Sequence, residues 1–174
     1  SIMQKKYKKI VISDATLRDG NHAIKHQINK NQIEMYCKAA EKAGTDIVEV
    51  GHGNGIGASS IQVGLSNLTD AKMLEISRKF LKKSKLGVHI IPGFATIQDI
   101  EVALKIGVDV FRVASHCTEA DITQKHIELI RKNNCKVFGV LMMSHMTSKE
   151  TLLEESKKMK KYGAQGIVLM DSAG

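Results

Sequence analysis

The feature of this chain that most restricts its fold is a regular alternation of short apolar stretches with amphipathic ones. The apolar stretches are continuous and rich in Val and Ile, a pattern typical of strands that are buried on both faces of a parallel sheet. Each is followed by a segment with apolar residues at helical spacing, and one such unit takes about thirty residues. This repeat predicts an α/β fold in which helices connect the strands of a parallel sheet.

Residue types favoured at helix ends set the bounds of the predicted elements. They are Thr69, Thr96 and Ser148 at the starts and Gly44, Gly107 and Gly163 at the ends. We predict helices over 31–43, 69–83, 96–106, 148–162 and from Glu119 or Asp121 to about 132. We predict strands over 10–12, 47–50, 86–91, 108–114, 136–143 and 166–170.

Polar and titratable residues recur where these strands end. They are Arg18, Asp19, His52, Ser115, His116, Ser144, His145, Asp171 and Ser172. A (β/α)8 barrel carries its chemistry at this rim, whereas a dinucleotide-binding sheet would place a Gly-x-Gly-x-x-Gly after the first strand, where this chain has none. We therefore predict an α/β fold of the (β/α)8 TIM-barrel type, with about six βα units present over 10–174 and a basic arm over 1–9.

The length of the chain is short for a closed barrel. Eight strands typically take about 250 residues, and the chain has 174. We expect the chain to be the N-terminal part of a longer protein. The alternatives are a barrel closed by exchange with a partner copy, or another topology.

Charge and composition narrow the class of partner. The net charge is +8, but aromatic residues make up only 4% and Trp is absent, so platforms for stacking bases are scarce and we expect no nucleic-acid partner. The lysine excess also fits attraction of small anionic substrates. No apolar run is long enough to span a bilayer, so we expect no membrane partner and a cytoplasmic location. Three widely spaced cysteines suggest buried free thiols.

Arg18, Asp19 and His22 combine three complementary chemistries within five residues. A guanidinium pairs with carboxylate or enolate oxygens, an aspartate suits Mg²⁺ or Mn²⁺, and a histidine moves protons near neutral pH. Together they favour stabilisation of an enolate beside a carboxylate, as in pyruvate chemistry. The alternative is an Arg–Asp ion pair that only fixes a loop.

One aspartate does not complete a metal site. Further candidate ligands are His52, His89, His116, His126, His145 and Asp171. We expect His89 and His126 to be packing or surface residues, because one lies inside a strand and the other in a helix. The spacing of Ser172 favours a helix N-cap over contact with a substrate carboxylate.

These motifs resemble those of the 4-hydroxy-2-oxovalerate aldolases, within the wider family of hydroxymethylglutaryl-CoA lyase and the isopropylmalate and homocitrate synthases. The wider family shares the segment over 16–20, TLRDG. The narrower group is indicated by 12–27, 48–53, 115–121, 141–146 and 171–174.

The resemblance implies retro-aldol cleavage of 4-hydroxy-2-oxoacids such as 4-hydroxy-2-oxovalerate to pyruvate and an aldehyde such as acetaldehyde. On this resemblance Arg18 stabilises the enolate and Asp19 is a ligand of Mn²⁺ (or Mg²⁺ or Co²⁺). His22 is the catalytic base, and Ser172 contacts the pyruvoyl carboxylate. The resemblance therefore favours substrate contact for Ser172, whereas its spacing alone favours a helix N-cap. It also implies an acylating acetaldehyde dehydrogenase as partner.

The chain departs from the family in what it lacks. A His-x-His pair that completes the family's metal site, and a tyrosine that lines the pocket, are expected beyond Gly174. We therefore expect the 174-residue chain alone to have little or no activity. The alternatives are an acyl-CoA/2-oxoacid condensing synthase and a non-catalytic scaffold that binds a dehydrogenase or self-associates as a homo-oligomer.

Overall fold

The computed structural model describes residues 13–14, 17–18, 28–51, 55–56 and 69–172. Six parallel strands form one sheet in the order β1-β2-β3-β4-β5-β6. The strands are β1 Ser13–Asp14, β2 Ile47–Glu49, β3 Lys85–Ile90, β4 Val110–His116, β5 Lys136–Met142 and β6 Ile167–Leu169. The helices are α2 Lys30–Ala43, α3 Asp70–Phe80, α4 Ile97–Ile106, α5 Gln124–Lys132 and α6 Lys149–Tyr162, with short 3-10 turns η1 Ala120–Thr123 and η2 Ser144–Met146.

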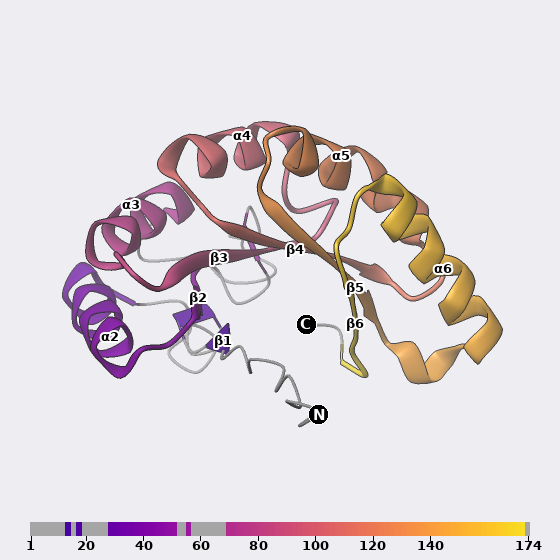
Figure 1. Ribbon diagram of the computed structural model, residues 1–174, viewed down its shortest axis with the longest axis horizontal. Coiled ribbons are helices and arrows are strands. Elements are labelled where there is room, and N and C mark those ends of the chain that lie inside the picture. Colours follow the sequence, from indigo (N-terminus) through magenta and orange to yellow (C-terminus); the bar gives the residue numbers. More distant parts are fainter. Residues whose placement is uncertain (1–12, 15–16, 19–27, 52–54, 57–68, 173–174) are drawn as a thin grey trace, which may run out of the picture.

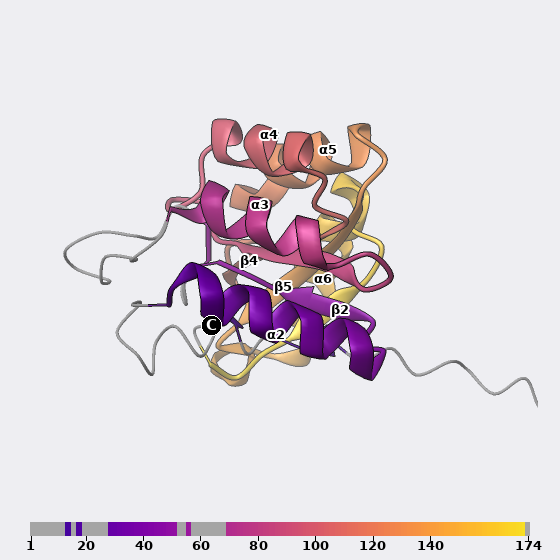
Figure 2. The same cartoon turned by 90° about the vertical axis from the view of Figure 1, so that its left-hand side faces the viewer.

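The sheet is strongly curved, and the helices lie along its convex side (Figure 1). Strands that are consecutive in the sequence are neighbours in the sheet, and a helix connects each strand to the next one. In the side view α2, α3 and α4 lie one above another (Figure 2). This arrangement confirms the prediction of a (β/α)8-type barrel with about six units present.

Strand alternation divides the apolar residues between two layers. Val88 and Ile90 of β3, and Phe111 and Val113 of β4, are fully buried in the main core between the sheet and the helices. A second cluster holds the alternate residues Ala114, Val140 and Met142 and lies on the concave face. The convex face of the sheet therefore packs against the helices in the main core. Among the described residues, the concave face carries only a small apolar cluster, so it has room for polar side chains.

Helix α3 ends at Phe80, three residues before its predicted end. The cause is Glu41 of α2, whose carboxylate accepts the backbone N–H groups of Lys82, of Lys83 at 2.8 Å and of Ser84 at 2.7 Å. An α-helix would direct these amides to carbonyls four residues back, so the carboxylate competes with helix continuation.

The remaining boundaries lie close to prediction. The N-caps Thr69, Thr96 and Ser148 each accept a backbone N–H from three residues on, as expected. Strand β4 runs two residues later than predicted, and the predicted helix that ends at Lys132 begins as the 3-10 turn η1. The first predicted strand, 10–12, and the basic arm, 1–9, lie outside the described residues.

Cys37 and Cys117 are buried free thiols, as predicted, whereas Cys135 is only partly buried because it follows the exposed end of α5. Among the described residues, the helices are too short or too polar to cross a bilayer.

Candidate functional site at the carboxyl ends of the strands

Arg18 is anchored beside the end of β1 by an acid on the neighbouring strand. The guanidinium Nε–H donates to the Glu49 carboxylate, and both side chains are almost fully buried. Asp14 of β1 accepts the hydroxyl of Tyr36, which ties this strand to α2. A buried charge is stable only when it is paired and hydrogen-bonded, so Glu49 largely determines where the Arg18 guanidinium lies.

Arg112 of β4 approaches the same acid from the other side. Its Nε lies 2.8 Å from Glu49 Oε2, and one terminal nitrogen donates to Oε1 at 3.1 Å. Among these three side chains, two guanidinium groups therefore meet one carboxylate. The cluster joins the segment after β1 to β2 and β4, and its two guanidinium groups outnumber its one carboxylate.

His89 of β3 completes the cluster as a neutral base. It pairs with Arg112 in the strand register and is fully buried. Burial, together with the positive charges of Arg18 and Arg112, lowers the pKa of His89 to about 3. Neither ring nitrogen has a hydrogen-bond partner among the described residues, a condition that costs about 1–3 kcal/mol for each buried polar group.

The ends of β5 and β6 are joined into one rim. Met143 has a φ of 55°, and its N–H donates to the carbonyl of Ser172 at 3.2 Å. The Ser144 hydroxyl donates to Asp171 Oδ1 at 3.0 Å. Left-handed backbone is costly for a residue with a side chain, so these bonds hold the turn after β5 and tie it to the segment after β6 that contains Asp171 and Ser172.

The other described candidate ligands do not gather into one metal-binding group. His145 Nδ1 is 3.8 Å from Asp171 Oδ1 and largely exposed, and His116 Nδ1 is 2.8 Å from the Thr118 hydroxyl. His126 Nε2 bonds the carbonyl of Ala95 at 2.9 Å, in the helical layer. Among the described residues, no group of three or more His, Cys, Asp or Glu side chains could hold a metal ion.

Several sequence predictions fall outside the described residues. Asp19, His22 and His52 all do. Arg18 and Ser172 are described, the first buried and the second exposed. Sequence reasoning missed Glu49 and Arg112. The signal for both was present, because each is a charged residue inside an otherwise apolar strand.

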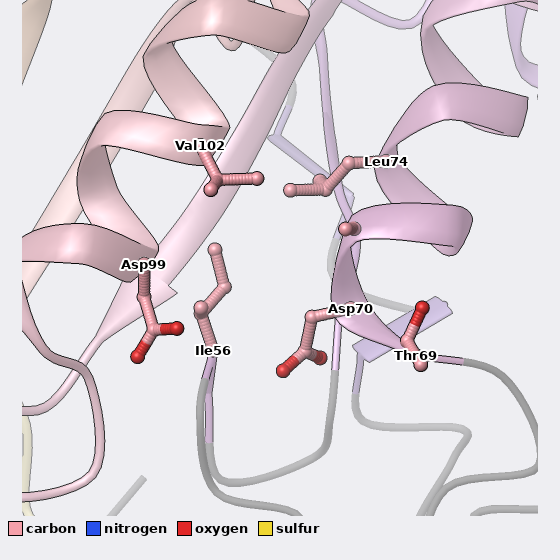
Figure 3. A pocket seen from close by; sticks show the side chains of 7 residues that line it. Ile56, Thr69, Asp70, Leu74, Asp99 and Val102 are labelled. Carbon is pink, nitrogen blue, oxygen red and sulfur yellow. The ribbon is translucent and has the colours of Figure 1, made fainter.

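Two cavities in the described part of the chain bear on where a ligand could bind. A hollow of about 210 Å³ lies on the concave face, where Glu49, Arg112, Val110 and Phe138 are among its lining residues. A second, of about 260 Å³, lies between the N-terminal ends of α3 and α4 (Figure 3).

In the second cavity Leu74 and Val102 face each other above Ile56, and Asp70 and Asp99 lie on either side of Ile56 (Figure 3). Asp99 already accepts the N–H of Thr96 in a capping box, and Asp70 begins α3. Helix capping therefore accounts for acids at these positions, and the concave face is the better candidate site.

Comparison with known proteins supports the sequence resemblance. The family model described as HMGL-like matches residues 9–174. The chain is 57% identical over 168 residues to the 4-hydroxy-2-oxovalerate aldolase of Pectobacterium atrosepticum, covering 96% of this chain and 49% of that protein. It is 58% identical over 166 residues to the protein of the same name from Spirochaeta aurantia, covering 95% and 49%. The chain thus spans about half the length of these curated relatives.

Solved structures of low sequence identity share the fold. The carboxyl transferase domain of Rhizobium etli pyruvate carboxylase matches with a TM-score of 0.76 at 14% identity, covering 95% of this chain and 31% of that one. The N-terminal domain of a putative aldolase from Bacteroides vulgatus matches with a TM-score of 0.63 at 16% identity, covering 92% and 62%. At these identities the likeness shows the architecture alone.

Proposed function

The chain belongs to the HMGL-like family, and we propose that it forms part of the active site of a divalent-metal-dependent aldolase that cleaves 4-hydroxy-2-oxoacids to pyruvate and an aldehyde. The observation that carries the proposal is the 57% identity to a 4-hydroxy-2-oxovalerate aldolase over 96% of this chain. The buried guanidinium at the end of β1 supports it, because this reaction needs a fixed cation where negative charge develops.

Arg18 stabilises the enolate that forms as the carbon–carbon bond breaks. Its ion pair with Glu49 holds the guanidinium before substrate arrives, so little reorganisation is needed during the reaction. Arg112 supports this arrangement, since it shares the carboxylate of Glu49. In this scheme Glu49 and Arg112 are positioning residues, and Arg18 contacts the reacting group.

Asp19 follows Arg18 directly, and its carboxylate suits a hard divalent cation such as Mn²⁺. When bound, the cation polarises the 2-oxo group and stabilises its negative charge. The family resemblance assigns the remaining ligands to a later histidine pair. His22 accepts the proton of the 4-hydroxyl group, which starts the cleavage.

Ser172 donates a hydrogen bond to the pyruvoyl carboxylate. Its backbone carbonyl is held by the N–H of Met143, so the residue has a defined place at the end of β6. A hydroxyl at this position supplies a donor without adding charge.

The resemblance extends the proposal to a partner and a location. We propose that the full-length protein passes its aldehyde to an acylating acetaldehyde dehydrogenase in the cytoplasm. Binding of the purified full-length protein to such a dehydrogenase, measured by light scattering, tests this part separately from catalysis. A mixture that contains only the two separate species would contradict it.

Pyruvate release tests the function directly. The full-length product of the gene that encodes this chain is incubated with 4-hydroxy-2-oxovalerate and Mn²⁺, and lactate dehydrogenase with NADH reports pyruvate. We expect turnover that falls at least a hundredfold in Asp19→Asn and His22→Ala. The 174-residue chain alone is expected to show little turnover. Absence of pyruvate release, with acetyl-CoA consumed in the presence of a 2-oxoacid, would favour a condensing synthase instead.

A further inference from the structure

His89 lies beside Arg18 and Arg112 of the candidate site but has no part in the chemistry above. Strand alternation places it on the concave face, because Val88 and Ile90 on either side are buried in the helical core. Its register partner is Arg112, which lines the concave hollow.

The surroundings of His89 leave its hydrogen-bonding capacity unused. Both ring nitrogens are buried without a partner among the described residues. The carboxylate of Glu49 is already engaged by Arg18 and Arg112. A buried polar side chain in a native protein nearly always has a partner, so two unpaired nitrogens at one site indicate a missing hydrogen-bonding group.

The backbone after β2 packs closely on the same residue. The N–H of Ile56 donates to the His89 carbonyl at 3.0 Å. Gly55 has a φ of 98°, and a Cβ there would lie 2.7 Å from that carbonyl oxygen and 3.4 Å from the ring carbon Cδ2. These contacts fix the histidine backbone while offering nothing to either ring nitrogen.

The two neighbouring arginines keep the ring neutral at physiological pH, because their charges and burial both disfavour the imidazolium form. A neutral imidazole carries one N–H donor and one acceptor. It therefore suits an uncharged hydroxyl of a ligand, which can accept from the N–H or donate to the other nitrogen, or a carbonyl, which accepts from the N–H.

The strand order indicates which part of a substrate would reach it. Arg18 follows β1 and Ser172 follows β6, the two edge strands of the described sheet. A pyruvoyl group held by both would leave the rest of the substrate directed toward the middle strands, where β3 carries His89. This step rests on the proposed function.

We propose that His89 is a specificity-determining residue that hydrogen-bonds an oxygen substituent in the aldehyde half of the substrate. The chain would then favour hydroxylated aldehydes over alkyl aldehydes of the same size. A site built to hydrogen-bond an oxygen discriminates strongly against an analogue that lacks it, because the polar group of the protein is left unpaired.

The experiment uses the full-length protein in the addition direction, with pyruvate and either glycolaldehyde or propionaldehyde, which have similar size. The readout is the ratio of the two kcat/KM values. We expect the ratio to fall at least tenfold in His89→Leu and to fall less in His89→Asn, which keeps a donor and an acceptor. His126→Leu, a matched change of a histidine in the helical layer, should leave the ratio unchanged.

Deuterium exchange at the methyl group of pyruvate separates this inference from the proposed function. Exchange without aldehyde requires only the pyruvoyl half of the site. Its absence in the unaltered protein would overturn the proposed function and this inference with it. Exchange together with an unaltered aldehyde ratio in His89→Leu would overturn the role of His89 alone. If His89→Leu does not fold, the ratio in His89→Phe decides, because phenylalanine keeps a planar ring without either nitrogen, and a value equal to that of the unaltered protein contradicts the proposal.

Discussion

The carboxylate of Glu49 on β2 accepts the Nε–H of Arg18, which lies 31 positions earlier in the chain. Arg112, 63 positions after Glu49, reaches the same carboxylate. One acid on β2 therefore links β4 and the segment that follows β1. Both arginines rely on this carboxylate as a counter-ion. Glu49 is therefore expected to control both the stability of the sheet and the position of the Arg18 guanidinium at the candidate site.

Replacing Glu49 with Gln keeps the shape of the side chain and removes its charge. The two guanidinium groups would then share no counter-ion at this position, and we expect the free energy of unfolding to fall by about 3 kcal/mol. Urea unfolding of the 174-residue chain measures the loss. Glu34→Gln is the control, because Glu34 forms an exposed pair with Lys38 at 2.8 Å and should be nearly neutral. Equal effects of the two changes would contradict the role of Glu49.

Stability should also depend on pH through His89. Its pKa is about 3 in the folded chain and near 6.5 in the unfolded one, so the unfolded chain binds more protons between these values. The resulting stabilisation is complete above about pH 6.5 and is lost progressively as the pH falls toward 3. We expect a loss of about 2 kcal/mol between pH 7 and pH 5 from this residue.

The difference between the unaltered chain and His89→Asn isolates this effect, because other titrating groups are common to both. Urea unfolding at a series of pH values should give a steeper acid loss for the unaltered chain. Parallel pH profiles would show that the histidine is not held neutral in the folded state.

Gly139 of β5 permits α6 to pack closely on the sheet. A Cβ at this position would lie 2.4 Å from Met159 Sδ and 3.0 Å from Ile167 Cδ1. Met159 is fully buried, so Gly139→Ala should cost about 2 kcal/mol through overpacking. The cost should be smaller in a Met159→Ala background, where the sulfur is absent, and a double-mutant cycle in urea measures this coupling. Additive effects would argue against direct contact.

Glu41 is expected to protect the chain segment that follows α3. Burial works to raise its pKa, but the hydrogen bonds from the backbone of Ser84, Lys82 and Lys83 outweigh this and lower it. Glu41→Ala should therefore speed hydrogen exchange at these three amides and lower the thermal midpoint by roughly 3 °C. Exchange at Leu74, inside α3, serves as the internal control. Unchanged exchange at the three amides would refute this role.

The fold could be predicted because its signals are local. Continuous apolar runs marked the strands, and Thr96 and Gly107 marked the two ends of α4 as the structure has them. The end of α3 was missed, because it depends on Glu41, a residue of α2 about forty positions away. Local propensity contains no information on such a contact.

The cluster around Glu49 was missed for a related reason. A charged residue in an apolar strand was visible, but its partners depend on the strand register, which pairs Arg112 with His89 and Glu49 with Gly87. His89 was expected to be a packing or surface residue, and it is buried. That both of its ring nitrogens are buried without a partner among the described residues follows from the packing around the strand, which the sequence alone does not reveal. The three complementary side chains of Arg18, Asp19 and His22, by contrast, predict a site from local sequence, and the family resemblance adds a role for each.

Ser172 provides a direct test of the proposed contact between the rim and the substrate carboxylate. In the full-length protein, Ser172→Ala should raise KM for 4-hydroxy-2-oxovalerate by about tenfold, since a hydrogen bond to a charged group contributes about 1.5–3 kcal/mol. Ser144→Ala is the matched control. The Ser144 hydroxyl donates to Asp171 at 3.0 Å, so its loss should alter the rim without removing a substrate contact. A rise in KM of the same size in both variants would show that the serine supports the turn rather than the carboxylate of the substrate.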